Sequence, residues 1–120
     1  MKLVIGYIPE TKNAFLYRDR LWNWGRFLDF NRFRDDYKIL LIIPAAYRAD
    51  DFMSAFNHNE VVFYDNWNES KVFLSDFIEK YKQENFVEDK NVVFILSAEE
   101  KYLESRFSRS HFLRFEMGVF

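Results

Sequence analysis

The fold is decided by residues 60–96, EVVFYDNWNESKVFLSDFIEKYKQENFVEDKNVVFIL, which follow a strand–helix–strand pattern. Residues 61–64 are a β-branched and aromatic run, and residues 91–96 form a second, nearly continuous apolar run. Between them, Asn66 and Glu69 have the spacing of a capping pair at the start of a helix. Two strands joined by a helix form a right-handed unit with parallel strands. The stretch therefore predicts an α/β fold.

The helix within this stretch carries one broad apolar face. Its members recur at helical spacing and are Phe73, Leu74, Phe77, Ile78 and Tyr81. Buried strands and the helix that faces them form the centre of such a sheet. We therefore expect the following side chains to be almost fully buried: Ile5, Leu40, Ile42, Val62, Phe77 and Phe94.

The rest of the chain continues the alternation of strands and helices. We predict strands over residues 2–8 and 38–43, each followed by a proline, which cannot donate to a strand ladder. The spacing over residues 14–33 predicts a helix, whose core face is Tyr17, Leu21, Trp24 and Leu28. The prediction is one α/β domain over residues 1–120, with three layers and a mostly parallel sheet of about four strands carrying helices on both faces.

Three segments fit the pattern less regularly. Residues 50–56 are compatible with a short helix, and residues 111–120 fit either an edge strand or a helix. Ser97 is predicted to cap the last helix, with Glu100 in the reciprocal capping position. These patterns do not specify the order of the strands in the sheet.

The composition excludes several classes of protein. The chain has no cysteine, which rules out disulfides, thiolate metal sites and thiol nucleophiles. Its three glycines are too few for a glycine-rich phosphate loop. No apolar run approaches the length of about 18 residues that suggests a membrane span. The apolar run that ends before Pro9 is too short to be the apolar core of a signal peptide. We expect a cytoplasmic protein with no membrane partner.

A ligand site is expected beyond the carboxyl ends of the strands, where open parallel sheets bind their ligands. Glu10 and Asp65 each follow a predicted strand and are candidate catalytic residues. They would serve an enzyme that acts on a nucleotide or an NAD-like, phosphate-bearing ligand. Together with Ser97 they could also hold Mg²⁺, which prefers oxygen ligands. Turn formation and helix capping account for all three residues equally, so no metal site is predicted and the cofactor stays unknown.

The end of the chain resembles a segment of two enzyme families. Residues 114–120, RFEMGVF, follow the strand at 91–96. They are similar to the segment ending in a glutamate and a glycine in Toll/interleukin-receptor-like NAD-cleaving domains and in nucleoside deoxyribosyltransferases. The resemblance implies that Glu116 attacks, or stabilises charge at, the anomeric carbon of a ribose. It covers this short segment alone, and the chain differs from both families by an additional strand.

A second stripe of residues runs along the predicted helix at 14–33. Arginines and aromatic rings share it at helical spacing, as Arg18, Trp22, Arg26, Phe30 and Phe33. Guanidinium groups beside rings favour cation–π contacts and anion pairing, and Trp, Phe and Arg are enriched in protein interfaces. The leading prediction is a binding protein that engages a macromolecular partner through this stripe. A protein partner is favoured over nucleic acid because the net charge is −2.

Other interpretations of the stripe stay open. Every arginine lies outside residues 50–104, where acidic residues outnumber basic ones. The arginines of the helix could therefore pair with this acidic segment of the same molecule, with the rings buried. Single-stranded nucleic acid, which stacks on rings flanked by arginine, is an alternative partner. The apolar C-terminal residues could also complete the sheet or core of a second copy, giving a homo-oligomer.

Overall fold

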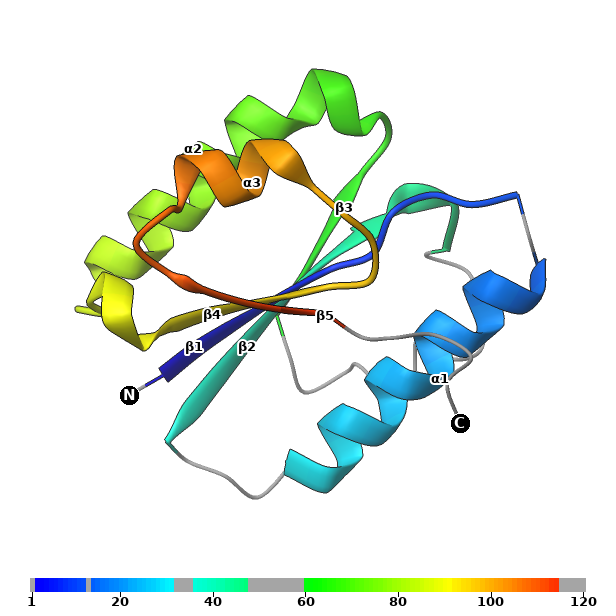
Figure 1. Cartoon of the computed structure of the whole chain (residues 1–120), viewed down its shortest axis with the longest axis horizontal. Helices are drawn as coiled ribbons and strands as arrows, with labels where there is room; N and C mark the ends of the chain where they lie inside the picture. Colours follow the sequence, from blue (N-terminus) through cyan, green and yellow to red (C-terminus); the bar gives the residue numbers. More distant parts are fainter. Residues whose placement is uncertain (1, 13, 32–35, 48–59, 115–120) are drawn as a thin grey trace.

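Figure 1 shows a computed structural model of the chain, which describes residues 2–12, 14–31, 36–47 and 60–114. One sheet contains five strands: β1 (Lys2–Tyr7), β2 (Tyr37–Pro44), β3 (Glu60–Tyr64), β4 (Val92–Leu96) and β5 (His111–Arg114). The α-helices are α1 (Ala14–Asn31), α2 (Trp67–Glu84) and α3 (Lys101–Arg106), and two single turns of 3₁₀ helix are η1 (Ala45–Tyr47) and η3 (Asp89–Asn91).

The sheet is entirely parallel, in the order β3-β2-β1-β4-β5. The predicted α/β class is confirmed, with five strands in place of about four. The additional strand is β5, which comes from the segment whose sequence fitted either a strand or a helix. Ile5 of β1 lies opposite Leu40 of β2 and Phe94 of β4, so these three residues mark the centre of the sheet.

The helices form a layer on each face of the sheet (Figure 1). The chain passes from β1 to β2 in one direction and from β3 through β4 to β5 in the other. Because crossovers between parallel strands are right-handed, this reversal puts α1 on one face and α2 and α3 on the opposite face. The direction changes between β1 and β4, which makes the carboxyl ends of these two strands the topological switch point of the fold.

Two apolar clusters fill the space between the layers. The larger one joins the sheet to α2 and α3, through Leu3, Ile5, Leu40, Leu74, Ile78, Phe94, Leu103, Phe107 and their neighbours. The smaller one lies under α1 and contains Val4, Ile8, Trp24, Leu41, Ile43, Tyr47 and Ile95. Successive apolar side chains of β1 to β4 alternate between the two clusters, as strand geometry requires. Within the described residues no helix combines the length and apolar character needed to cross a membrane.

The capping prediction for α2 is confirmed, and the one for α3 is wrong. The Asn66 side chain accepts a hydrogen bond from the Glu69 backbone N–H at 3.2 Å, which satisfies one of the open donors of the first turn. Before α3, however, the capping residue is Glu100, whose carboxylate accepts from the Tyr102 N–H at 3.0 Å. Ser97 is instead buried at the end of β4, where it contacts α1.

The predicted core is correct at the centre of the sheet and too wide at its periphery. Ile5, Leu40, Ile42 and Phe94 are buried. Val62 is only partly buried because its strand, β3, is at the edge of the sheet. Phe77 is also partly buried, and Phe73 of the predicted apolar face is 72% exposed, since α2 turns Leu74, Ile78 and Tyr81 toward the sheet.

Candidate functional site

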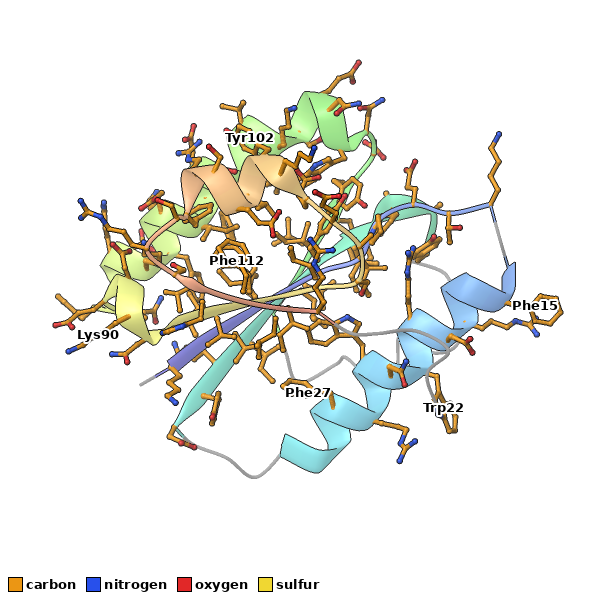
Figure 2. All side chains as sticks on the ribbon, in the orientation of Figure 1. Phe15, Trp22, Phe27, Lys90, Tyr102 and Phe112 are labelled. Atoms are coloured by element: carbon orange, nitrogen blue, oxygen red, sulfur yellow. The ribbon has the colours of Figure 1, made fainter. Side chains whose placement is uncertain are left out.

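Helix α1 presents two chemically different faces. Arg20, Trp24 and Phe27 lie on the side that faces the sheet, where Trp24 is fully buried. Phe15, Arg18, Trp22 and Arg26 follow one another at spacings of three or four residues and therefore share the opposite side. In Figure 2, the labelled rings of Phe15 and Trp22 project away from the molecule, whereas Phe27 points toward the sheet. We call Phe15, Arg18, Trp22 and Arg26 the outer face of α1.

The outer face of α1 is accessible to a partner. Phe15 is 81% exposed and Trp22 is 56% exposed. Arg18 and Arg26, which precede and follow Trp22 by one turn, are also exposed. Of the other predicted members of this stripe, Phe30 belongs to the last turn of α1, and Phe33 is outside the described residues.

The arginines of the outer face do not pair with the acidic segment within the part of the chain that the structure describes. Ion pairs between an arginine and that segment are made from the other end of the sequence, by Arg106 with Asp76 and by Arg114 with Glu104. Neither Arg18 nor Arg26 takes part in an ion pair with a described residue. No ion pair with a described residue therefore neutralises the charges of Arg18 and Arg26.

The carboxylates predicted at the carboxyl edge of the sheet are both exposed. Glu10 follows β1 and Asp65 follows β3, and β2 lies between these two strands. Two strand spacings correspond to about 10 Å across the sheet. The described residues contain no group of three or more His, Asp or Glu side chains suited to a metal ion. Glu116 is outside the described residues, so the ribose chemistry suggested by the tail stays a prediction.

A buried polar cluster occupies the same edge at the switch point, and the sequence analysis did not single it out. Arg20 of α1 is only 7% exposed. Its Nη2 donates to the Ser97 carbonyl oxygen at 3.4 Å, and the indole Nε1 of Trp24 donates to the Ser97 hydroxyl oxygen at 3.4 Å. Ser97 itself continues the pairing of β4 with β1, since its backbone N–H donates to the Tyr7 carbonyl oxygen.

Three tyrosines complete this cluster. The Tyr64 hydroxyl donates to the Ile8 carbonyl oxygen at 2.7 Å, and the Tyr47 hydroxyl accepts from the Thr11 N–H at 3.2 Å. The Tyr7 ring lies 4.6 Å from the Trp67 ring and 6.2 Å from the Tyr64 ring, measured between centroids. We call Arg20, Ser97, Tyr7, Tyr47, Tyr64 and Trp67 the switch-point cluster.

Burial controls the protonation states in the switch-point cluster. It raises the pKa of the Tyr7 phenol to about 12, and the nearby negative charges of Glu100 and Glu10 act in the same direction. Burial likewise raises the pKa of Tyr47 and of Tyr64 and lowers the pKa of the Arg20 guanidinium. The tyrosines are therefore neutral at neutral pH, while an arginine keeps its proton. The cluster carries the positive charge of Arg20.

A small hollow of about 140 Å³ lies near the amino ends of β4 and β5. Three cations line it, Lys82, Arg106 and Arg109. Lys82 is buried, pairs with Glu79 and Asp89 and lies 5.6 Å from the centre of the Phe107 ring. The charge of Lys82 is matched by two carboxylates, and this ion-pair cluster joins α2 to η3.

The helical spacing of residues in α1 could have identified Arg20 as a candidate site residue. Arg20 is one turn before Trp24 and so falls on the face predicted to pack against the sheet. A charged residue at such a position is rare unless it is paired or functional.

No protein-family model matches the chain, and no curated protein or solved structure matches it either.

Proposed function

We propose that the chain is a protein-interaction module that binds an acidic protein surface through the outer face of α1. The observation that carries the proposal is the exposure of Trp22, at 56%, between two exposed arginines one turn away on either side. A tryptophan flanked by arginines is the composition of an interface anchor, because the ring buries a large area and each guanidinium binds a carboxylate.

The geometry of the outer face supports a partner with a particular arrangement of charges. Arg18 and Arg26 are eight residues apart, which corresponds to about 12 Å along a helix. A matching surface has carboxylates at this separation and an apolar recess between them for the Trp22 ring. Solvent-exposed Asp19 lies beside this face and adds a negative charge, as does the net charge of −2. Both disfavour a polyanion and favour a protein surface.

A second copy of the chain is the alternative partner for the outer face of α1, and it must be distinguished from a different protein. The outward side of α2 carries Phe73, which is 72% exposed, and exposed Val72, with the carboxylate of Glu69 one turn before Phe73. This side lies on the opposite face of the sheet from α1 (Figure 1). A contact between the two would be head-to-tail, so it would build chains of molecules in place of closed dimers.

The proposal is tested by selecting binders from a displayed library of random peptides. We expect peptides rich in Asp and Glu with Leu or Phe between them, and we expect Trp22→Ala and Arg26→Glu each to weaken their binding about thirtyfold. Matched controls are Phe73→Ala and Arg109→Glu, which change an exposed ring and an exposed arginine away from α1. Selected peptides that bind both α1 variants as tightly as wild type would overturn the proposal.

Two further measurements would identify nucleic acid or a second copy of the chain as the partner in place of an acidic protein. Tight binding of an oligouridine, lost steeply as salt increases, would identify nucleic acid as the partner and contradict the proposal. Sedimentation that shows growing assemblies abolished by both Arg26→Glu and Phe73→Ala would identify the second copy.

A further inference from the structure

We propose that the switch-point cluster is a binding site for the phosphate group of a small molecule, with Arg20 as its anchor. The site differs from the outer face of α1, since Arg20 lies on the side of the helix that faces the sheet. It is placed where the loops after β1 and β4 leave toward opposite faces, which is the position at which open parallel sheets bind ligands.

The first argument is the unmatched charge of Arg20. Its side chain is more than nine-tenths buried, and within the described residues it forms no ion pair with a carboxylate. The groups that act on its pKa, apart from burial itself, are the hydroxyls of Tyr7, Tyr47 and Tyr64, which are neutral at neutral pH. A buried charge without a counter-charge is costly. A bound anion would supply the missing counter-charge.

The second argument is an excess of hydrogen-bond donors. The Nε–H of Arg20 is buried and has no acceptor among the described residues, and the same holds for the indole Nε1–H of Trp67. Trp67 contacts the rings of Tyr7 and Tyr64, which are two of the three tyrosines that interact with the Arg20 charge. Buried donors without acceptors are rare in native proteins. Each of these two donors would be satisfied by a ligand that offers only acceptors.

The third argument is the way in which α1 fixes Ser97. Arg20 donates to its carbonyl oxygen and Trp24 donates to its hydroxyl oxygen, so both acceptors at the end of β4 are oriented by one helix. An oxygen that accepts from Trp24 still carries its own proton, which it can donate. A phosphate group, which has three terminal oxygens and accepts from guanidinium groups in forked pairs, fits these donors better than a carboxylate does.

The carboxylates near the site set limits on the ligand. Glu100 and Glu10 act on Tyr7, but Glu10 is exposed and Glu100 accepts from the Tyr102 N–H. Neither forms an ion pair with Arg20. A ligand with one phosphate group therefore fits better than a polyanion, whose additional charges would approach these carboxylates.

The test uses inorganic phosphate as the probe and the indole N–H signals of ¹⁵N-labelled protein as the readout. Trp67 belongs to the switch-point cluster, Trp24 donates to Ser97 of that cluster, and Trp22 on the outer face is an internal control. We expect the Trp24 and Trp67 signals to shift in a saturable way, with a Kd of about 1 mM or tighter, and the Trp22 signal to stay in place. Arg20→Lys should weaken binding about tenfold or more, because the forked donor geometry is lost.

Two variants at other residues of the cluster test the proposal even if a change at Arg20 prevents folding. Trp67→Phe removes one of the buried donors and keeps an aromatic ring, and Ser97→Ala removes the hydroxyl; each should weaken phosphate binding. Arg26→Glu should leave phosphate binding unchanged and therefore separates this site from the outer face of α1. Stronger binding of adenosine monophosphate than of inorganic phosphate would assign a nucleotide, and the reverse would assign the free anion. Equal shifts with chloride at matched ionic strength, tighter binding of acetate, or unchanged phosphate binding in both donor variants would overturn the proposal.

Discussion

Gly6 and Trp24 form a matched pair beneath α1. A Cβ atom added at Gly6 would lie 2.3 Å from Cη2 of Trp24 and 2.8 Å from a methyl carbon of Leu41, closer than packed atoms can approach. The indole is fully buried and tied to Ser97, so it has little room to move. We predict that Gly6→Ala destabilises the protein by about 1–3 kcal/mol through overpacking, measured by urea unfolding. Trp24→Phe in the same chain should recover part of this loss, and additive effects of the two changes would contradict the account.

Phe94 is the central side chain of the larger apolar cluster. It is fully buried on β4 and lies 4.9 Å from Phe107 and 4.8 Å from Phe112, measured between ring centroids. Phe94→Ala should cost about 3–5 kcal/mol because the surrounding rings cannot close the cavity. The control is Phe73→Ala on exposed α2 surface, which should change stability by less than about 0.5 kcal/mol. Similar melting temperatures for the two variants would show that the central position of β4 is wrong.

At the scale of single residues, apolar character predicted well which side chains are buried. Local sequence spacing predicted the roles of the polar side chains poorly. Ile5, Leu40 and Phe94 could be assigned to the core because runs of apolar residues in a parallel sheet are covered on both faces. The role of Ser97 was mistaken, since local spacing suggested a helix cap while its hydroxyl contacts Trp24, which is distant in sequence. Arg20 was overlooked for the same reason: its partners come from β1, η1, β3 and the end of β4.

At the scale of elements, η3 is joined to α2 by a partly buried ion pair. Lys82 donates to Asp89, and this hydrogen bond is the main reason that the pKa of Asp89 is lowered below its usual value of 3.8. A carboxylate with a lowered pKa stabilises the folded state above the pKa of the unfolded chain. That contribution is lost as the pH falls through the folded-state pKa.

This pair gives a prediction about pH. Asp89→Asn should lower the free energy of unfolding at neutral pH, and the difference from wild type should shrink as the pH is taken well below 3.8. Urea unfolding at a series of pH values measures it. Glu99→Gln, at an exposed carboxylate, is the control and should show no such trend. A difference between Asp89→Asn and wild type that persists unchanged in acid would contradict the ion-pair account.

The strands and helices themselves were largely predictable, because apolar residues recur at different spacings in strands and in helices. The periodic face of α2 was placed too broadly, however. Five apolar residues spread over more of the helix surface than the sheet can cover, and packing selects Leu74, Ile78 and Tyr81 while leaving Phe73 in solvent. Segment 111–114 was ambiguous for a different reason. It became β5 because it pairs with β4, an interaction that its own sequence does not encode.

At the scale of the whole molecule, strand order is what the sequence could not provide. The order β3-β2-β1-β4-β5 depends on the direction in which each crossover travels, and local patterns are the same for either direction. That order separates Glu10 from Asp65 by an intervening strand and brings Arg20 to the end of β4. The outer face of α1 was easier to predict, because helical spacing alone determines that Arg18, Trp22 and Arg26 share one side.

The central claim is that Arg26 binds a carboxylate of a partner protein while Trp22 fills the neighbouring recess. A charge exchange tests it most directly, using a peptide selected for binding to the wild-type chain. The dissociation constant is measured for wild type and for Arg26→Glu, each with the selected peptide and with peptides in which one acidic residue is replaced by arginine. We predict that Arg26→Glu loses about thirtyfold in affinity for the selected peptide, and that one of the replaced peptides restores binding to Arg26→Glu while binding wild type poorly. Equal affinity of wild type and Arg26→Glu for the selected peptide, or a loss that none of the replaced peptides restores, would contradict it.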